Sequence, residues 1–223
     1  YIFMTQLVGS YTFVNKSRLT IAPGWMIENA ASLNDLNNEN AFEDSDLVSG
    51  ATRNLNILLL PGDYRFKLGG IKTKFYWDLA YNLEGRKRFE NIYRINEGRI
   101  DSQGDLRIEK NHTTTDDLAF LVGLQLGENK RKGDWSVFAN YRQVGASALD
   151  PNLTDSDFAL GEVNVRGVKL SLAYNFTDFA TGVVSLYHAQ ALRDIAGGEL
   201  TGGQAIGDLS SFQMIQVDLN VKF

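Results

Sequence analysis

Apolar and polar residues alternate strictly through much of this 223-residue chain. The pattern is clearest near the end, in QVDLNVKF, where Val217, Leu219 and Val221 are separated by Asp218 and Asn220. Successive side chains of a β-strand point to opposite faces of a sheet, so this segment predicts a strand with one apolar and one charged face. Helical periodicity is nearly absent from the chain, which is therefore predicted to be all-β.

Nine stretches carry this pattern and are predicted to be strands: residues 1–14, 18–27, 52–60, 69–82, 117–127, 134–145, 164–176, 179–191 and 211–223. Most have roughly the 9–11 residues with which a tilted strand crosses a bilayer. In the fourth stretch one face holds Ile71, Thr73, Phe75, Trp77, Leu79 and Tyr81. The stretch 179–191 alternates less cleanly, and the sequence does not assign its faces.

The connections between these strands alternate between long and short along the chain. The short ones are expected at 14–17, 61–65, 127–134 and 175–178, and the long ones at 28–51, 83–116, 146–163 and 192–210. Outer-membrane barrels have short turns on one rim and long loops on the other. The pattern predicts one domain, residues 1–223, folded as an antiparallel transmembrane β-barrel.

Aromatic residues gather beside the two expected rims. The short-turn side is expected to carry Phe13, Tyr64, Phe66, Trp135, Phe176, Phe179 and Phe223, and the long-loop side Tyr81, Tyr141 and Tyr187. Aromatic rings prefer the headgroup zone of a membrane, so the two groups predict two interfacial girdles.

The number of predicted strands is odd, whereas single-chain bacterial barrels of this class have even numbers. Either one strand is miscounted, or the chain is the C-terminal part of a longer barrel. Tyr1 begins inside an alternating pattern, so we expect the second case, with the barrel incomplete at the N-terminus.

Charge and composition narrow the function classes. The net charge is -5 and no basic stripe is present, which argues against a nucleic-acid partner. The chain has no cysteine, which excludes thiol catalysis, disulfides and zinc–thiolate sites. No apolar run approaches the 18 residues of a transmembrane helix. No cofactor is expected.

Residues 133–188 carry a set of motifs that resembles a known family. They hold a W-x-V-x-x-x-Y-R strand from Trp135 to Arg142, a loop with T-D-S-D-F at 154–158, and a G-x-x-L-x-L-x-Y strand from Gly167 to Tyr174. This set resembles the C-terminal half of the bacterial "putative porin" family. The aromatic end at Phe223 resembles the signal that the barrel-assembly machinery recognises.

The resemblance implies a bacterial outer-membrane barrel of about sixteen strands, surrounded by outer-membrane lipid. It also implies a water-filled channel for passive diffusion of small hydrophilic solutes or ions, assembled as a homotrimer or a larger membrane assembly. Two alternatives remain: a structural or adhesive barrel with a plugged lumen and partner-binding loops, and a soluble β-sandwich binding module.

The polar faces of the clearest strands are expected to line the pore. They present Lys72, Lys74, Asp78, Arg142, Lys169, Asp218 and Lys222. A ring of one charge sign biases which ions enter a channel, and the excess of bases favours anions. The alternative is that these side chains are solvated or mutually paired, without effect on selectivity.

Three further segments carry candidate chemistry. The acidic loop 28–46 offers oxygen ligands to calcium, but its spacing matches no EF-hand, and a solvated loop is the plainer interpretation. Segment 83–116 balances acids and bases and folds either into the pore or outward. Asp155 and Asp157 hold a cation or brace their loop by turn hydrogen bonds, and bracing is favoured.

Enzymatic activity is not expected. His112 and His188 are the two side chains suited to act as bases at neutral pH, and neither lies in a recognised catalytic motif. The glycine-rich stretch 197–207 lacks a phosphate-binding motif and is interpreted as a loop.

Overall fold

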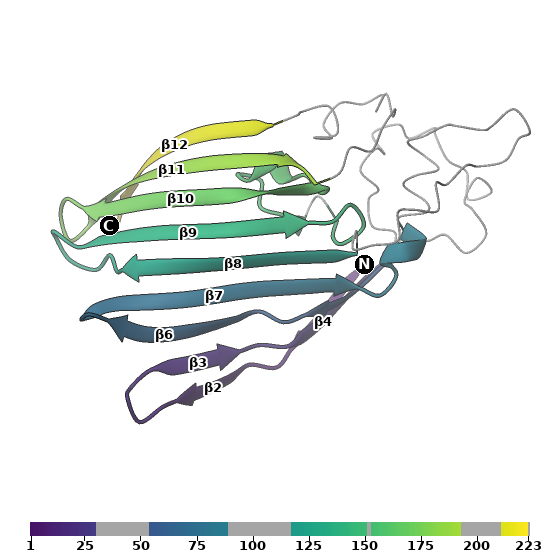
Figure 1. The fold of residues 1–223 in the computed structure, drawn as a ribbon, viewed down its shortest axis with the longest axis horizontal. Coiled ribbons are helices and arrows are strands. Elements are labelled where there is room, and N and C mark those ends of the chain that lie inside the picture. Colours follow the sequence, from purple (N-terminus) through teal and green to yellow (C-terminus); the bar gives the residue numbers. More distant parts are fainter. Residues whose placement is uncertain (30–53, 89–116, 151–152, 193–210, 223) are drawn as a thin grey trace, which may run out of the picture.

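The computed structural model describes residues 1–29, 54–88, 117–150, 153–192 and 211–222. These parts of the chain fold almost entirely into antiparallel β-sheet (Figure 1). The strands are β1 (Ile2–Gln6), β2 (Gly9–Thr12), β3 (Arg18–Ile21), β4 (Gly24–Glu28), β5 (Leu55–Leu59), β6 (Gly62–Leu68), β7 (Ile71–Asn82), β8 (Leu118–Gly127), β9 (Trp135–Val144), β10 (Val165–Asn175), β11 (Ala180–Ala191) and β12 (Phe212–Val221).

The first six strands run end to end in pairs and form three longer strands, each interrupted once; each such pair is called a line here. β1 continues into β2, β3 into β4 and β5 into β6, and the paired halves face the same neighbours. Two of the breaks contain Pro23 and Pro61, which have no backbone N–H to donate to a ladder. The carbonyls of both prolines still accept hydrogen bonds, from Leu7 N at 2.9 Å and Ala22 N at 2.9 Å.

One predicted turn is wrong. Residues 61–65 were expected to form a short connection, but Gly62–Leu68 is strand β6 and pairs with β7 along its whole length. The reversal lies further on, at Gly69 and Gly70, whose φ angles are +57° and +87°. A two-residue hairpin turn with both φ positive strongly favours glycine. The sequence PGD resembles a turn, but Pro61 only interrupts a strand that resumes after it.

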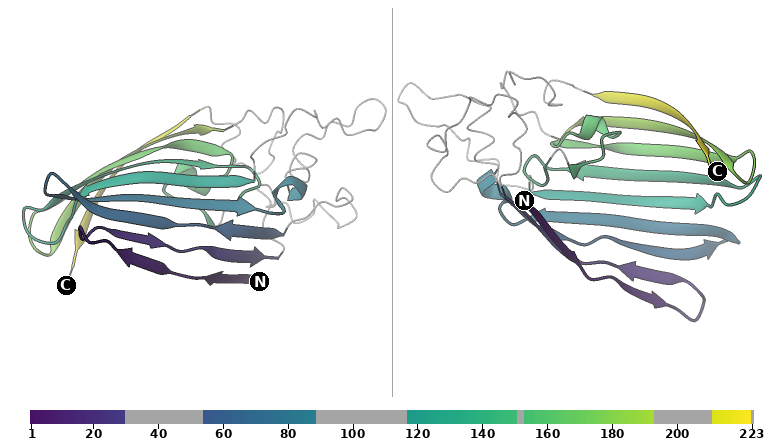
Figure 2. Two further views of the ribbon diagram at one scale, coloured as in Figure 1. Left: turned by 60° about the horizontal axis from the view of Figure 1, so that its bottom comes forward. Right: turned by 180° about the vertical axis from the view of Figure 1, so that it is seen from behind.

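The strands follow one another across a single curved sheet that is not closed (Figures 1 and 2). Within the described ranges, β12 pairs with β11 alone, and β1 and β2 form the opposite edge. An open, curved antiparallel sheet is consistent with part of a barrel. The expected total of about sixteen strands stays a prediction.

The cross-strand register assigns every strand residue to one of two faces. The convex face carries the apolar sets expected from the sequence, for example Leu170 beside Leu186 and Ile215. Many of these side chains are exposed, Val217 by 74%. The register also assigns β11: Val184, Leu186 and His188 lie on the convex face, and Ser185 and Tyr187 on the concave face.

Short connections mark one end of the sheet, as the sequence predicted for three of its four short turns. The described short connections, residues 13–17, 69–70, 128–134 and 176–179, lie at one end (Figure 1). Aromatic pairs gather at this end, such as Tyr64 and Phe66 with ring centroids 5.3 Å apart. Tyr187 was expected in the girdle at the other end, but it faces inward and is only 4% exposed. Phe223 lies outside the described residues.

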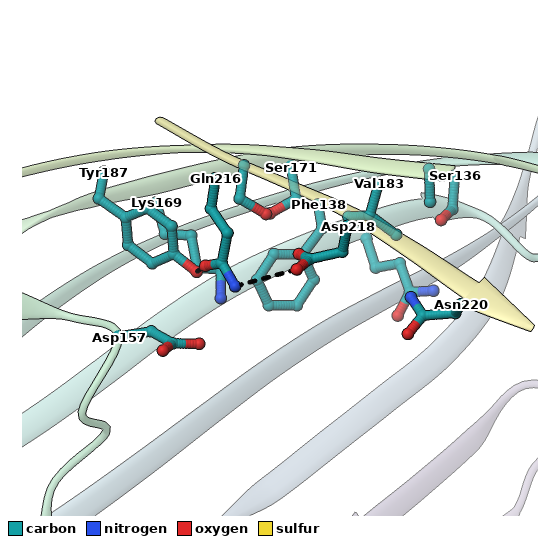
Figure 3. A pocket seen from close by; sticks show the side chains of 13 residues that line it. Ser136, Phe138, Asp157, Lys169, Ser171, Val183, Tyr187, Gln216, Asp218 and Asn220 are labelled. Atoms are coloured by element: carbon teal, nitrogen blue, oxygen red, sulfur yellow. Dashed lines mark hydrogen bonds between the residues drawn. The ribbon is translucent and has the colours of Figure 1, made fainter. Parts of the chain in front are cut away.

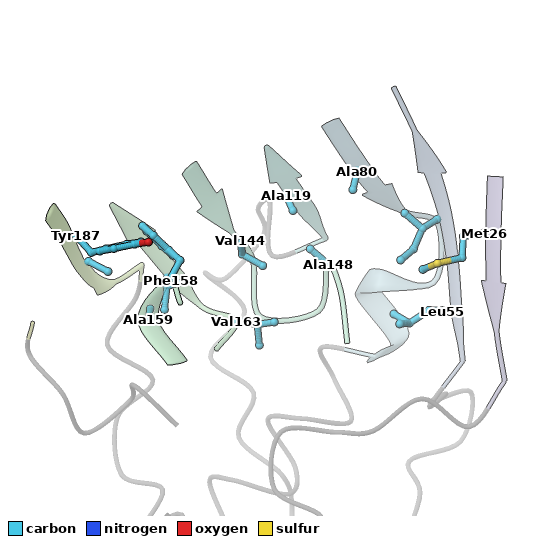
Figure 4. Packing of buried hydrophobic residues seen from close by; sticks show 13 residues of the cluster. Met26, Leu55, Ala80, Ala119, Val144, Ala148, Phe158, Ala159, Val163 and Tyr187 are labelled. Carbon is cyan, nitrogen blue, oxygen red and sulfur yellow. The ribbon is translucent and has the colours of Figure 1, made fainter. Parts of the chain in front are cut away.

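An apolar cluster occupies the concave side at the long-loop end. Small or branched wall residues, among them Ala80, Ala119 and Val144, pack against Phe158, Ala159 and Val163 from the connection between β9 and β10 (Figure 4). No helix in the described ranges is long and apolar enough to cross a membrane.

Candidate channel interior

The register places six of the seven predicted pore-lining residues on one side of the sheet. Lys72, Lys74 and Asp78 on β7, Arg142 on β9, Lys169 on β10 and Asp218 on β12 share the concave face by register, and Lys222 follows Asp218 in the same alternation. Lys72 and Lys74 lie close together on β7. Asp78 lies further along β7, and Asp218 lies on β12 at the edge of the sheet. That these residues line a pore stays a prediction.

The concave face of β8–β12 is polar and hollowed. A cavity of about 420 Å³ lies against it (Figure 3). Its wall is held by hydrogen bonds between side chains: Tyr187 Oη donates to Gln216 Oε1 at 3.1 Å, and Gln216 Nε2 donates to Asp218 Oδ1 at 3.2 Å. The hydroxyls of Ser171 and Ser185 lie 2.8 Å apart. Such a surface suits water and hydrophilic solutes.

The connection between β9 and β10, residues 145–164, folds over this face and is called here the inward segment. Arg142 attaches it to the wall in two ways. Its Nη2 lies 2.9 Å from Asp155 Oδ2, and its guanidinium lies 4.3 Å from the ring centroid of Phe158. Asp157 lines the same cavity as the β10–β12 side chains (Figure 3). The described part of this segment therefore narrows the space on the concave side.

Backbone and amide contacts fix the beginning and the tip of the inward segment. Gly145 N donates to Leu118 O at 3.0 Å, and the buried Asn82 Nδ2 donates to Ser147 O at 2.6 Å. Asp155 Oδ1 accepts a hydrogen bond from Asp157 N at 3.2 Å. The predicted bracing role of Asp155 is therefore confirmed, and Arg142 adds an ion pair that the sequence did not indicate.

Buried charges gather at the long-loop end. Arg88, in a helical turn at residues 85–88, is fully buried, and burial lowers the pKa of its guanidinium to about 10. The negative charges of Asp150 and Glu28 oppose this lowering. Even with a pKa of about 10 the guanidinium remains charged at neutral pH. Arg88 therefore interacts electrostatically with the end of β4 and with the start of the inward segment.

Glu162 is a second buried ionisable group in the inward segment. Burial raises the pKa of its carboxyl to about 7. Desolvation disfavours the charged form of a carboxylic acid, and the described surroundings supply no cation that reverses this effect. The protonation of Glu162 therefore changes within the physiological pH range.

The short-turn end carries exposed ion pairs. Glu128 pairs with Lys72 and with Lys130, and these contacts hold the pKa of the Glu128 carboxyl below its usual value. Asp134 Oδ2 accepts hydrogen bonds from Arg131 N at 2.8 Å and Lys130 N at 3.0 Å, which lowers the pKa of Asp134. These contacts fix the connection between β8 and β9.

Sequence reasoning missed three basic residues of the concave face: Arg18, Arg65 and Lys67. The misplaced turn hid two of them, because strand β6 has Asp63, Arg65 and Lys67 in strict alternation with apolar neighbours. The alternation pattern also gave no indication that the inward segment folds onto the concave face.

Several sequence hypotheses concern residues that the structure does not describe. Most of the acidic loop 28–46, most of segment 83–116, the glycine-rich stretch 197–207 and His112 lie outside the described ranges. Within those ranges no group of three or more His, Asp or Glu side chains comes together to hold a metal ion. His188 lies on the convex face.

Comparison with known proteins agrees with this architecture. No curated protein and no solved structure gives a significant match to the chain. A family model described as "Putative porin" matches residues 32–223, which is most of the chain and includes every predicted pore-lining residue. The chain belongs to this putative porin family.

Proposed function

We propose that the protein forms a water-filled channel in the bacterial outer membrane, through which small hydrophilic solutes or ions diffuse passively. The observation that carries this proposal is the opposite character of the two faces of the sheet. An apolar convex face suits lipid, and a polar concave face suits a wet lumen. Membership of the family supports a porin-like outer-membrane protein. Lipid, solutes and a homotrimer are the partners that we propose.

Conductance in a planar lipid bilayer tests this proposal. Full-length protein, purified in detergent and shown to be folded by heat-modifiable gel mobility, is added to one side of the bilayer. Stepwise increases of current are expected, and boiled protein serves as the control. A bilayer that stays silent with folded protein would refute diffusion through the barrel.

The inward segment favours a second candidate, a structural barrel whose lumen is filled. Its apolar residues Phe158, Ala159 and Val163 pack on the concave face, as the core of a plugged barrel would. Folded protein without conductance would support this candidate. The β-sandwich alternative has less support, because all described strands belong to one sheet and no second sheet covers its apolar face within these ranges.

A further inference from the structure

Three basic side chains lie in one row across neighbouring strands of the concave face. Arg18 on β3 is directly opposite Arg65 on β6, and Arg65 is directly opposite Lys74 on β7. Lys67 and Lys72 are opposite each other in the row nearer the turns. We call these five residues the basic rows.

The arrangement is costly for the isolated sheet. Neighbouring strands are about 4.8 Å apart, and like charges directly opposite each other destabilise a sheet. Each of the three cross-strand pairs in the basic rows joins two cations. Packing alone gives no reason to place them there, because uncharged polar residues would suit a wet surface equally well.

Carboxylates in the described ranges neutralise only part of this charge. Asp63 pairs with Arg65 at 2.7 Å, and Glu128 pairs with Lys72. Arg18 donates to the uncharged Ser10 Oγ at 3.0 Å, and the Lys74 ammonium lies 4.9 Å from the centroid of the Tyr76 ring. Neither Arg18 nor Lys74 forms an ion pair with a described carboxylate.

The charged groups are open to solvent. The side chains of Arg65 and Lys72 are 59% and 54% exposed, and Arg18 and Lys67 are also exposed. Beside β10–β12 the cavity is lined by Asp157 and Asp218 together with Lys169, so both charge signs are present there. The five bases on β3, β6 and β7 are therefore the larger concentration of positive charge on the described concave face.

We propose that the basic rows form a binding site for small oxyanions on the solute path. Two neighbouring guanidinium groups and a lysine offer charge-assisted hydrogen bonds to the several oxygens of one anion. A bound oxyanion also relieves the repulsion among the cations. This inference rests on the proposed channel and specifies the solutes that it favours.

Two measurements test the site, with inorganic phosphate as the probe. In planar bilayers under a potassium chloride gradient, the reversal potential of the wild-type protein is expected to show anion preference. Added phosphate is expected to reduce the chloride current and to saturate. The variant Arg18→Gln, Arg65→Gln, Lys74→Gln is expected to lose both properties. A matched variant, Lys130→Gln, Arg131→Gln, Lys132→Gln, removes three charges from the nearby turn and is expected to keep them.

Phosphate binding to folded protein in detergent, measured by calorimetry, separates this inference from conduction. The triple variant of the basic rows is expected to bind phosphate about tenfold more weakly, or not at all, because charge-assisted hydrogen bonds are lost. Cation preference of the wild type, or equal binding by wild type and row variant, overturns the site. A silent bilayer with intact phosphate binding refutes the channel and leaves the site standing.

Discussion

At the scale of single residues, Glu162 makes the stability of the inward segment depend on pH. Its folded-state pKa of about 7 lies above the usual value of 4.5, so folding favours the protonated form. Stability is therefore greatest below about pH 4.5 and falls as the pH rises to about 7. The full loss is at most about 3 kcal/mol, from 1.36 kcal/mol per unit of pKa.

Glu162→Gln should remove this pH dependence. The variant is expected to match the wild type near pH 4.5 and to be more stable above pH 7, because the amide carries no charge to desolvate. Urea unfolding of protein in detergent or lipid vesicles at the two pH values measures the difference. Glu84→Gln is the control, since Glu84 pairs with Lys87 at a more exposed position. Equal destabilisation at both pH values would show that Glu162 acts only through packing.

The structure, and not the sequence, explains why position 123 holds a glycine. A Cβ at this position would lie 2.2 Å from the ring of Tyr76, which stacks on Phe138 with centroids 5.2 Å apart. Gly123→Ala is expected to displace Tyr76 and to cost about 1–3 kcal/mol, as overpacking usually does. Unfolding in urea measures the cost, and Ala139→Gly on the convex face is a control. An unchanged free energy of unfolding would mean that Tyr76 moves freely.

At the scale of elements, sequence alternation was a good guide to strands and a poor one to their interruptions. The faces of β7, β8, β10 and β12 could be predicted because each has an unbroken period of two. Pro61 and Gly62 broke that period in the β5–β6 line, and a true turn at Gly69 and Gly70 was therefore placed too early. A proline can interrupt the hydrogen bonds of a strand without reversing the chain. Local sequence does not distinguish such an interruption from a turn.

The candidate site was predictable only where it belongs to a strand. Lys169 and Asp218 follow from alternation, whereas Asp157 reaches the same cavity from a connection. Two nearby residues set its position, because Asp155 and Phe158 both contact Arg142. Phe158 also packs in the cluster with small strand residues such as Ala189. Such contacts join residues far apart in sequence, and no periodicity indicates them.

Arg142 is expected to control how firmly the inward segment is held. Arg142→Ala removes the ion pair to Asp155 and the contact with Phe158, and should weaken attachment by about 1–2 kcal/mol, since Asp155 is partly exposed. Single-channel recordings should show larger or more variable conductance than the wild type. Arg166→Ala, on the convex face of β10, is the control. Unaltered conductance in Arg142→Ala would indicate that apolar packing alone holds the segment.

At the scale of the whole molecule, the two faces of one sheet differ in chemical character: the convex face is apolar and the concave face is largely polar. A soluble sheet of this size would cover its apolar face with a second layer. Here the convex apolar side chains remain exposed across β7–β12, while polar side chains and the inward segment occupy the concave side. The sheet thus has its exposed apolar side chains on the outside and its polar side chains on the inside, the reverse of a soluble protein.

Adjacent residues of β10 provide a direct test of this arrangement. Leu172 lies on the convex face and is 54% exposed, and Ala173 lies on the concave face beside the cavity. Leu172→Arg should destabilise the protein in lipid vesicles by up to about 2–4 kcal/mol, because a charge on the lipid-facing side of a barrel is costly. Ala173→Arg should cost much less, since water reaches its face. Urea titrations in vesicles measure both. If both cost the same, the convex face does not contact lipid, and the channel proposal loses its basis.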